Sequence, residues 1–90
     1  MIAIYIVTKN MTAEQHTTGR ERLRAVGAPE KAMKLHSCFG EDGQLQVFDI
    51  WENQEAFDEF LTYLEPVMEE LGIELAQPPV VMPVVDFEQQ

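Results

Sequence analysis

The chain has 90 residues, 46% of them hydrophobic and 24% charged, with a formal net charge of −10. This length allows one domain with one core, spanning residues 1–90, and the composition is globular rather than disordered. The negative charge argues against nucleic acid and anionic membranes as partners, because both attract basic surfaces.

The charge is divided unevenly along the chain. Residues 1–40 contain all six bases and three acids, a net of +3, whereas residues 41–90 contain thirteen acids and no base, a net of −13. We expect part of this imbalance to be matched between two neighbouring helices, although exposed ion pairs stabilise little.

Cysteine content and apolar runs suggest where the protein resides. Cys38 is the only cysteine, so an intrachain disulfide is excluded and a reducing cytoplasm is expected. The longest apolar runs, Ile2–Val7 and Val80–Val85, are far shorter than the about 20 residues that cross a bilayer. Lys9 ends the first run too early for a signal peptide.

The first predicted elements are a strand and a helix. Ile2–Thr8 is rich in β-branched residues and apolar on both alternating faces, as in a central strand covered on two sides. Thr12 and Gln15 then form a capping box, and Gly27 is a stop signal. The expected helix, 13–26, has only a thin apolar stripe.

A hairpin follows this helix. Two runs of strand-forming residues, Ala32–Phe39 and Gln44–Glu52, flank Asp42-Gly43, the residue pair preferred in a type I′ turn. A two-residue turn predicts that one face of the hairpin carries three cross-strand pairs: Lys34 with Trp51, His36 with Asp49, and Cys38 with Val47. The other face then holds Leu35, Ser37, Phe39, Gln46, Phe48 and Ile50.

The second predicted helix is strongly amphipathic and begins after Asn53, a good cap, and ends at Gly72. We expect it to cover the hairpin face that holds Leu35, Phe39, Phe48 and Ile50. The last strand is expected over Val80–Phe87, at a sheet edge because Pro83 cannot donate to a ladder.

The order strand–helix–strand–strand–helix–strand predicts an α+β, ferredoxin-like fold: a four-stranded antiparallel sheet with two helices on one face. In this interpretation the other face carries the His36–Asp49 pair together with Tyr5 of the first strand. An apolar face of that size implies a partner surface. We therefore expect a homodimer in which two sheets pack face to face, a dimeric α+β barrel.

The segment VFDIWENQEAF, Val47–Phe57, resembles the strand–helix junction of dimeric α+β barrel proteins related to the antibiotic-biosynthesis monooxygenase (ABM) domain. Leu64-Glu-Pro66 and Met82-Pro-Val84 are similar to later parts of that domain. The resemblance covers residues 30–88 and implies a homodimer with a cavity. Some relatives are cofactor-independent oxygenases of electron-rich aromatic substrates, some degrade haem, and many have no assigned activity. The helix histidine of the haem-degrading branch has no counterpart over 54–71, so no cofactor is expected.

His36 and Asp49 are the candidate catalytic residues. A histidine held beside a carboxylate is fixed in one tautomer and suits a general base. Tyr5 and Trp51 could stack on an aromatic ligand, with Lys34 and Cys38 completing a substrate-binding face. The alternative is that His36–Asp49 is a structural cross-strand pair and that Trp51 packs under the second helix.

Other chemistry has weaker support. His36, Cys38 and Asp49 do not supply the three or four good ligands that a zinc site needs, so no metal is predicted, and Cys38 is expected to act as a small hydrophobe. His16 has no partner that the sequence identifies, and we expect it to be solvated or to cap a helix.

Three functions remain open from the sequence. The first is a dimeric protein that binds a small apolar or aromatic molecule in a cavity lined by the His36/Asp49 face. The second is an enzyme, a cofactor-independent ABM-like monooxygenase or related proton-transfer enzyme with an aromatic substrate. The third is a structural or accessory dimer.

Overall fold

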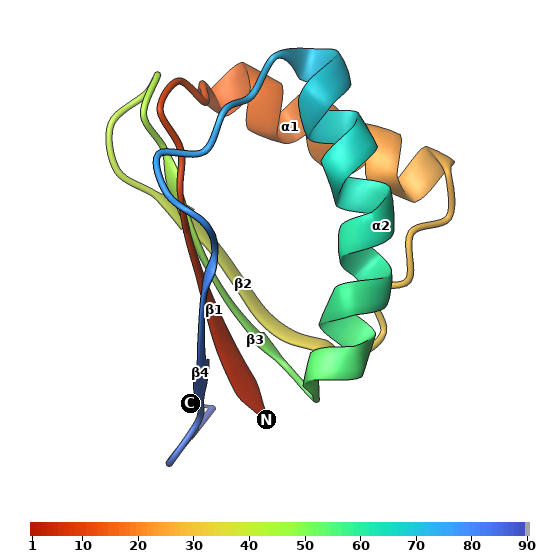
Figure 1. Ribbon diagram of the computed structural model, residues 1–90, viewed down its shortest axis with the longest axis vertical. Coiled ribbons are helices and arrows are strands. Elements are labelled where there is room, and N and C mark those ends of the chain that lie inside the picture. Colours follow the sequence, from red (N-terminus) through yellow and green to blue (C-terminus); the bar gives the residue numbers. More distant parts are fainter. Residues whose placement is uncertain (90) are drawn as a thin grey trace.

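The chain forms six regular elements, four strands and two helices (Figure 1). The computed structural model describes residues 1–89. The elements are β1 (Ile2–Val7), α1 (Ala13–Ala25), β2 (Met33–Phe39), β3 (Gln46–Trp51), α2 (Gln54–Leu71) and β4 (Val80–Pro83). The predicted order of elements is confirmed.

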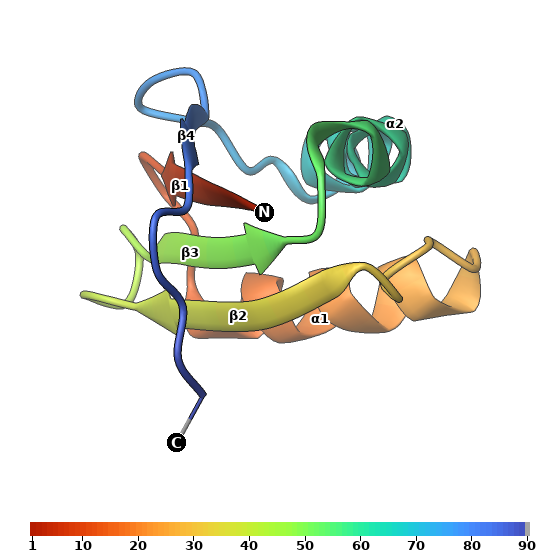
Figure 2. The same cartoon turned by 90° about the horizontal axis from the view of Figure 1, so that it is seen from below.

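The four strands form one antiparallel sheet in the order β2-β3-β1-β4. Both helices lie on the same side of this sheet, as Figures 1 and 2 show from two directions. This is the ferredoxin-like α+β fold expected from the sequence. β4 is an edge strand, as predicted, but it ends at Pro83 rather than at Phe87.

The hairpin register is confirmed over most of its length, with His36 opposite Asp49 and Cys38 opposite Val47. The predicted type I′ turn is wrong, because that turn needs positive φ at both central residues and only Gly43 has it, at 96°. The loop is instead tied to the start of α1. Asp42 Oδ1 accepts from the backbone N–H of Ala13 at 2.7 Å, and Met11 O accepts from Gly43 N at 3.1 Å.

A register shift near the start of β2 displaces one predicted pair. Met33, not Lys34, lies opposite Trp51, because a bulge falls between Met33 and Leu35. Lys34 is consequently exposed and forms an ion pair with Glu52 at 3.8 Å. The predicted Lys34–Trp51 pair is therefore wrong.

The assignment of the two sheet faces is also reversed relative to the sequence prediction. Asp49 and Trp51 lie on the face covered by the helices, in the same core as Ile4 and Phe57. Tyr5 lies opposite Phe48, so it shares the uncovered face and not the face of His36. The residues expected under α2, namely Leu35, Phe39, Phe48 and Ile50, lie on that uncovered face as well. A strand that is apolar on both faces gives no periodic signal that distinguishes them.

The two helices approach each other closely at Gly19. A Cβ placed on this buried residue would be 3.5 Å from Leu71 Cδ1 and 3.9 Å from Val67 Cγ1, so α1 approaches α2 here. Arg22 and Glu70 form an ion pair between the same helices. The pair matches a base from the positive half of the chain with an acid from the negative half, as the charge pattern predicted.

Both helices begin at the predicted caps. Thr12 Oγ1 accepts from Gln15 N at 3.0 Å while Gln15 Oε1 accepts from Thr12 N at 2.9 Å, which completes the capping box. Asn53 Oδ1 accepts from Ala56 N at 2.8 Å, and Gly72 ends α2 with a φ of 72°. Over residues 1–89, neither helix combines the length and the apolar character that a membrane span requires.

Candidate functional site

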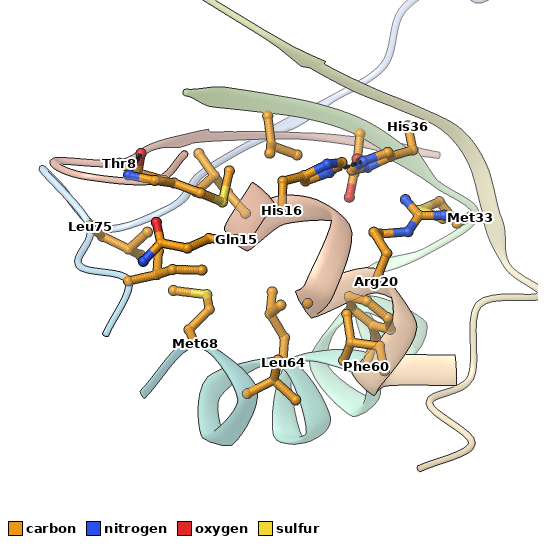
Figure 3. A pocket seen from close by; sticks show the side chains of 18 residues that line it. Thr8, Gln15, His16, Arg20, Met33, His36, Phe60, Leu64, Met68 and Leu75 are labelled. Atoms are coloured by element: carbon orange, nitrogen blue, oxygen red, sulfur yellow. Dashed lines mark hydrogen bonds and ion pairs between the residues drawn. The ribbon is translucent and has the colours of Figure 1, made fainter. Parts of the chain in front are cut away.

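A cavity of about 80 Å³ lies between the sheet and the two helices (Figure 3). Most of its wall is apolar and comes from several elements, among them β1 with Ile6, β3 with Val47, and α2 with Leu64 and Met68. α1 supplies a different surface, because His16 and Arg20 face the cavity there. The cavity therefore joins an apolar wall to a polar one.

The polar wall is built around a buried carboxylate. Asp49 on β3 is only 4% exposed. Its Oδ1 is 2.7 Å from Nδ1 of His36, directly opposite on β2, and its Oδ2 accepts from Trp51 Nε1–H at 3.2 Å. Because Asp49 accepts on both oxygens, it fixes the proton of His36 on Nδ1 when the carboxylate is ionised.

A second histidine extends this chain of hydrogen bonds. Nε2 of His16 lies 3.0 Å from Nε2 of His36, and the two rings are parallel within 2° with centroids 5.2 Å apart. One of these nitrogens must donate and the other accept, so the pair shares a single proton. The expectation that His16 is solvated or caps a helix is therefore wrong.

The surroundings of His16 favour its neutral form. Burial lowers the pKa of His16, and the neighbouring His36 and Arg20 lower it further, while Asp49 opposes them. A neutral His16 can donate from Nε2 to His36 and still accept at Nδ1. The arrangement His16–His36–Asp49 can thus carry a proton from the cavity towards a buried carboxylate.

The remaining predicted site residues lie elsewhere. Trp51 has no exposed surface and packs against Phe57 and Phe60, with ring centroids 5.8 and 4.9 Å away. Tyr5 donates to Gln46 on the uncovered sheet face. Cys38 packs beside the core, and burial together with Asp49 raises the pKa of its thiol, which disfavours the nucleophilic thiolate.

Arg20 is the second cavity residue that the sequence interpretation missed. It is half-buried, and its Nε is buried without a hydrogen-bond partner among residues 1–89. A usable signal was present, because His16, Gly19, Arg20 and Leu23 follow the i, i+3, i+4, i+7 spacing of one helix face. The stripe looked thin because two of its four positions are polar.

The donor set does not favour a metal. Within the described part of the chain, no three His, Cys, Asp or Glu side chains come close enough together to hold an ion. The Nε2 atoms of His16 and His36 already bond to each other, and the positive Arg20 lies in the same wall. Proton transfer and anion binding fit this wall better than metal coordination does.

Comparison with known proteins establishes the fold. No family model and no curated protein matches the sequence. A variant of SnoaB, a cofactor-independent oxygenase from Streptomyces nogalater, has a similar structure, with a TM-score of 0.68, 14% identity, and coverage of 99% of this chain and 97% of that one. A Chloroflexus aurantiacus protein, assigned provisionally to antibiotic biosynthesis monooxygenases, gives a TM-score of 0.65 at 10% identity, with coverage of 99% and 98%.

A regulatory protein has a related architecture. The regulatory subunit of aspartate kinase from Thermus thermophilus matches with a TM-score of 0.57 and 15% identity, over 91% of this chain and 50% of that one. Similar folds thus serve both oxygenation and regulation, so the site and not the fold must decide the function. The predicted likeness is confirmed at the level of structure: this chain has the ferredoxin-like fold of the ABM-type monooxygenases.

Proposed function

We propose that this protein binds a small, largely apolar molecule in the cavity between the sheet and the helices. The observation that supports this most is the His16–His36–Asp49 chain in the wall of an otherwise apolar cavity. A few convergent polar groups in an apolar pocket are typical of ligand sites. A purely structural His–Asp pair would require neither the cavity nor the second histidine.

The size of the cavity limits the ligand in the unliganded state. A water molecule needs at least about 10–15 Å³ in a measure of this kind, whereas an engineered cavity of about 150 Å³ holds benzene. At about 80 Å³ the cavity can hold several waters, and a single aromatic ring would require wall side chains to move. Met68 and Met11 line the cavity and are suited to such movement, because methionine is flexible and unbranched.

A homodimer is part of the same proposal. The uncovered sheet face carries apolar side chains on all four strands, among them Tyr5, Leu35, Phe48, Ile50 and Met82. Phe39 is 42% exposed and Met82 48% exposed in the single chain. Two such faces packed together would bury what water now contacts.

The dimer is tested by sedimentation equilibrium of the full chain at micromolar concentration. Phe39→Glu places a charge on the uncovered face, and we expect it to shift a dimer towards monomer. Val85→Glu is the matched control, because Val85 is 99% exposed and lies outside the sheet. A wild-type protein that sediments as a monomer would contradict the proposal.

Catalysis is the second candidate function: a cofactor-independent oxygenase or related proton-transfer enzyme that acts on an aromatic substrate. The 2.7 Å contact between His36 and Asp49 favours it, because it orients a base. Both ring nitrogens of His36 are occupied, so His36 and Asp49 must act through His16. Oxygen uptake with hydroquinone-type substrates tests this role, and equal rates in the wild type and His36→Ala would contradict it.

The cellular location remains a proposal too. A lone cysteine is compatible with a reducing cytoplasm, and the raised pKa of the Cys38 thiol slows its oxidation. Fractionation of the native host's cells would test it, and recovery outside the cytoplasm would refute it.

A further inference from the structure

Six polar side chains line the cavity, and most of them are already satisfied by the protein. Thr8 Oγ1 donates to Leu45 O at 2.6 Å, and Gln15 is bonded through both ends of its amide, to Thr12 N and Leu71 O. His36 and Asp49 are occupied by each other and by their neighbours. Among the side chains of the cavity wall, only His16 and Arg20 have a nitrogen that forms no hydrogen bond within residues 1–89.

The free groups on these two side chains are complementary in chemistry. Nδ1 of His16 bonds to no other group in residues 1–89 and is not among the fully buried polar atoms that lack a partner, so it keeps some contact with solvent. Nε of Arg20 is buried and has no acceptor, and no acid of the described chain forms an ion pair with Arg20. A buried N–H without an acceptor is costly, and a bound water, ion or ligand oxygen can supply the missing acceptor.

His16 and Arg20 come from one helix face, and Figure 3 shows the Arg20 side chain beside the two histidine rings. The charged and titratable groups that face His16 are Arg20 on its own helix, His36 on β2 and Asp49 on β3. α2 contributes only apolar residues to the cavity wall: Phe60, Leu64, Val67 and Met68. The one negative group, Asp49, is already held by two donors.

We propose that the cavity selects an acid and binds it as its anion, with the anionic oxygen on Arg20 and the rest of the molecule against the apolar wall. This rests on the proposed binding function and names the class of its ligand. The oxygen is that of a carboxylate or of an ionised phenol. Arg20 supplies a charge-assisted hydrogen bond to either one.

His16 allows the site to bind weak acids that are protonated in solution, because it can accept their proton. The ligand's O–H proton passes to Nδ1 of His16, and the electron pair stays on the ligand oxygen. The proton on Nε2 of His16 then moves to Nε2 of His36, so His16 is neutral again and His36 becomes an imidazolium paired with Asp49. One proton has moved from ligand to His36, and the total charge is unchanged.

Three probes separate the steps of this proposal. Nitrobenzene tests the apolar cavity alone, and its binding is read from quenching of Trp51, the only tryptophan. Benzoate, already ionised near neutral pH, tests the anion site by competition. 4-Nitrophenol reports its own protonation, because phenol and phenolate absorb at different wavelengths. The full chain is used at a pH below the free phenol's pKa.

The expected results distinguish the two residues. Bound 4-nitrophenol shows the phenolate spectrum, and Arg20→Gln weakens benzoate and nitrophenolate about tenfold or more while leaving nitrobenzene within about twofold. His16→Gln keeps benzoate binding within about threefold but returns bound nitrophenol to its neutral spectrum, because glutamine cannot take the proton. Arg24→Gln, an exposed arginine on the same helix, changes none of the three.

Several outcomes would overturn the proposal. If nitrobenzene binds but the wild-type protein does not bind benzoate and holds nitrophenol in its neutral form, the anion site is refuted while the proposed binding function stands. Equal benzoate affinity in Arg20→Gln and the wild type refutes the role of Arg20. If none of the three probes binds, the proposed function fails as well. The spectrum of 4-nitrophenol bound to the wild-type protein tests the proton transfer even if a variant does not fold.

Discussion

Replacing Asp49 by asparagine should reverse two hydrogen bonds of the site, those that His36 forms with residue 49 and with His16, without breaking them. The carboxylate accepts from His36 Nδ1 and from Trp51 Nε1. Since Trp51 can only donate, the asparagine oxygen must face Trp51 and its NH₂ must face His36. His36 then accepts at Nδ1 and carries its proton on Nε2, so it donates to His16 instead of accepting from it.

The free energy of unfolding should fall by about 2 kcal/mol. Hydrogen bonds to a charged group contribute about 1.5–3 kcal/mol and neutral ones about 0.5–1.5 kcal/mol, a difference of about 1 kcal/mol for each of the two bonds. Asp49 is 4% exposed, so solvent screens this difference little. Asp49→Ala should cost about 3–5 kcal/mol, because it leaves both donors buried and unpaired.

Urea denaturation at one fixed protein concentration measures these changes, and ¹⁵N chemical shifts of the imidazole rings identify the tautomers. The control is Asp58→Asn on α2, where an exposed carboxylate accepts from Gln54 and the change should stay within about 0.5 kcal/mol. If His36 still carries its proton on Nδ1 in Asp49→Asn, Trp51 does not orient this side chain as the hydrogen bonds indicate. A cost equal to that of the Asp58 control would show that Asp49 does not anchor the site.

Three further predictions follow from the same geometry. The folded-state pKa of His16 lies below its ordinary value of 6.5, so the folded chain binds fewer protons than the unfolded chain and acidification through that pH lowers the free energy of unfolding. Urea titrations from pH 8 to 5 should therefore show a shallower fall in the free energy of unfolding for His16→Gln than for the wild type. Gly19→Ala should stabilise by about 0.5–1 kcal/mol in thermal denaturation, since the added methyl meets ordinary contacts, whereas Gly27→Ala, at a φ of 74°, should destabilise by about 1 kcal/mol. Trp51→Phe should cost about 2–4 kcal/mol in urea, because it leaves a cavity and takes a donor from Asp49; a cost below 1 kcal/mol would refute that role.

The fold was predictable because its local signals agreed with one another. The caps at Thr12 and Asn53, the glycine at 72 and the Asp42-Gly43 turn delimit elements whose order allows few topologies. The register of His36 against Asp49 followed from the length of the loop and survived the error in turn type. The turn type itself depends on bonds to Met11 and Ala13, which are remote in sequence.

The site was predictable only in part. His36 and Asp49 were paired from local information, but the face on which the helices pack depends on which set of apolar residues makes the better core. Trp51 decides this in the structure, because its ring fits between Phe57 and Phe60 while its N–H reaches Asp49. That choice places His36 under α1 and brings His16 to it, a contact between residues 20 positions apart.

The weak apolar stripe of α1 is best explained by the site. A helix that covers a sheet is stabilised by apolar residues at i, i+3, i+4 and i+7, and His16 and Arg20 occupy two such positions. Both are half-buried, and Arg20 keeps a buried N–H without a partner among residues 1–89 at a cost in stability. α2, with the same task on the same sheet, uses apolar residues at its cavity-facing positions. Polar residues at sheet-facing positions are thus found on the one helix that faces the His36–Asp49 pair. A site that binds a ligand is expected to be less stable than an apolar core at such positions, because its polar groups are kept for the ligand.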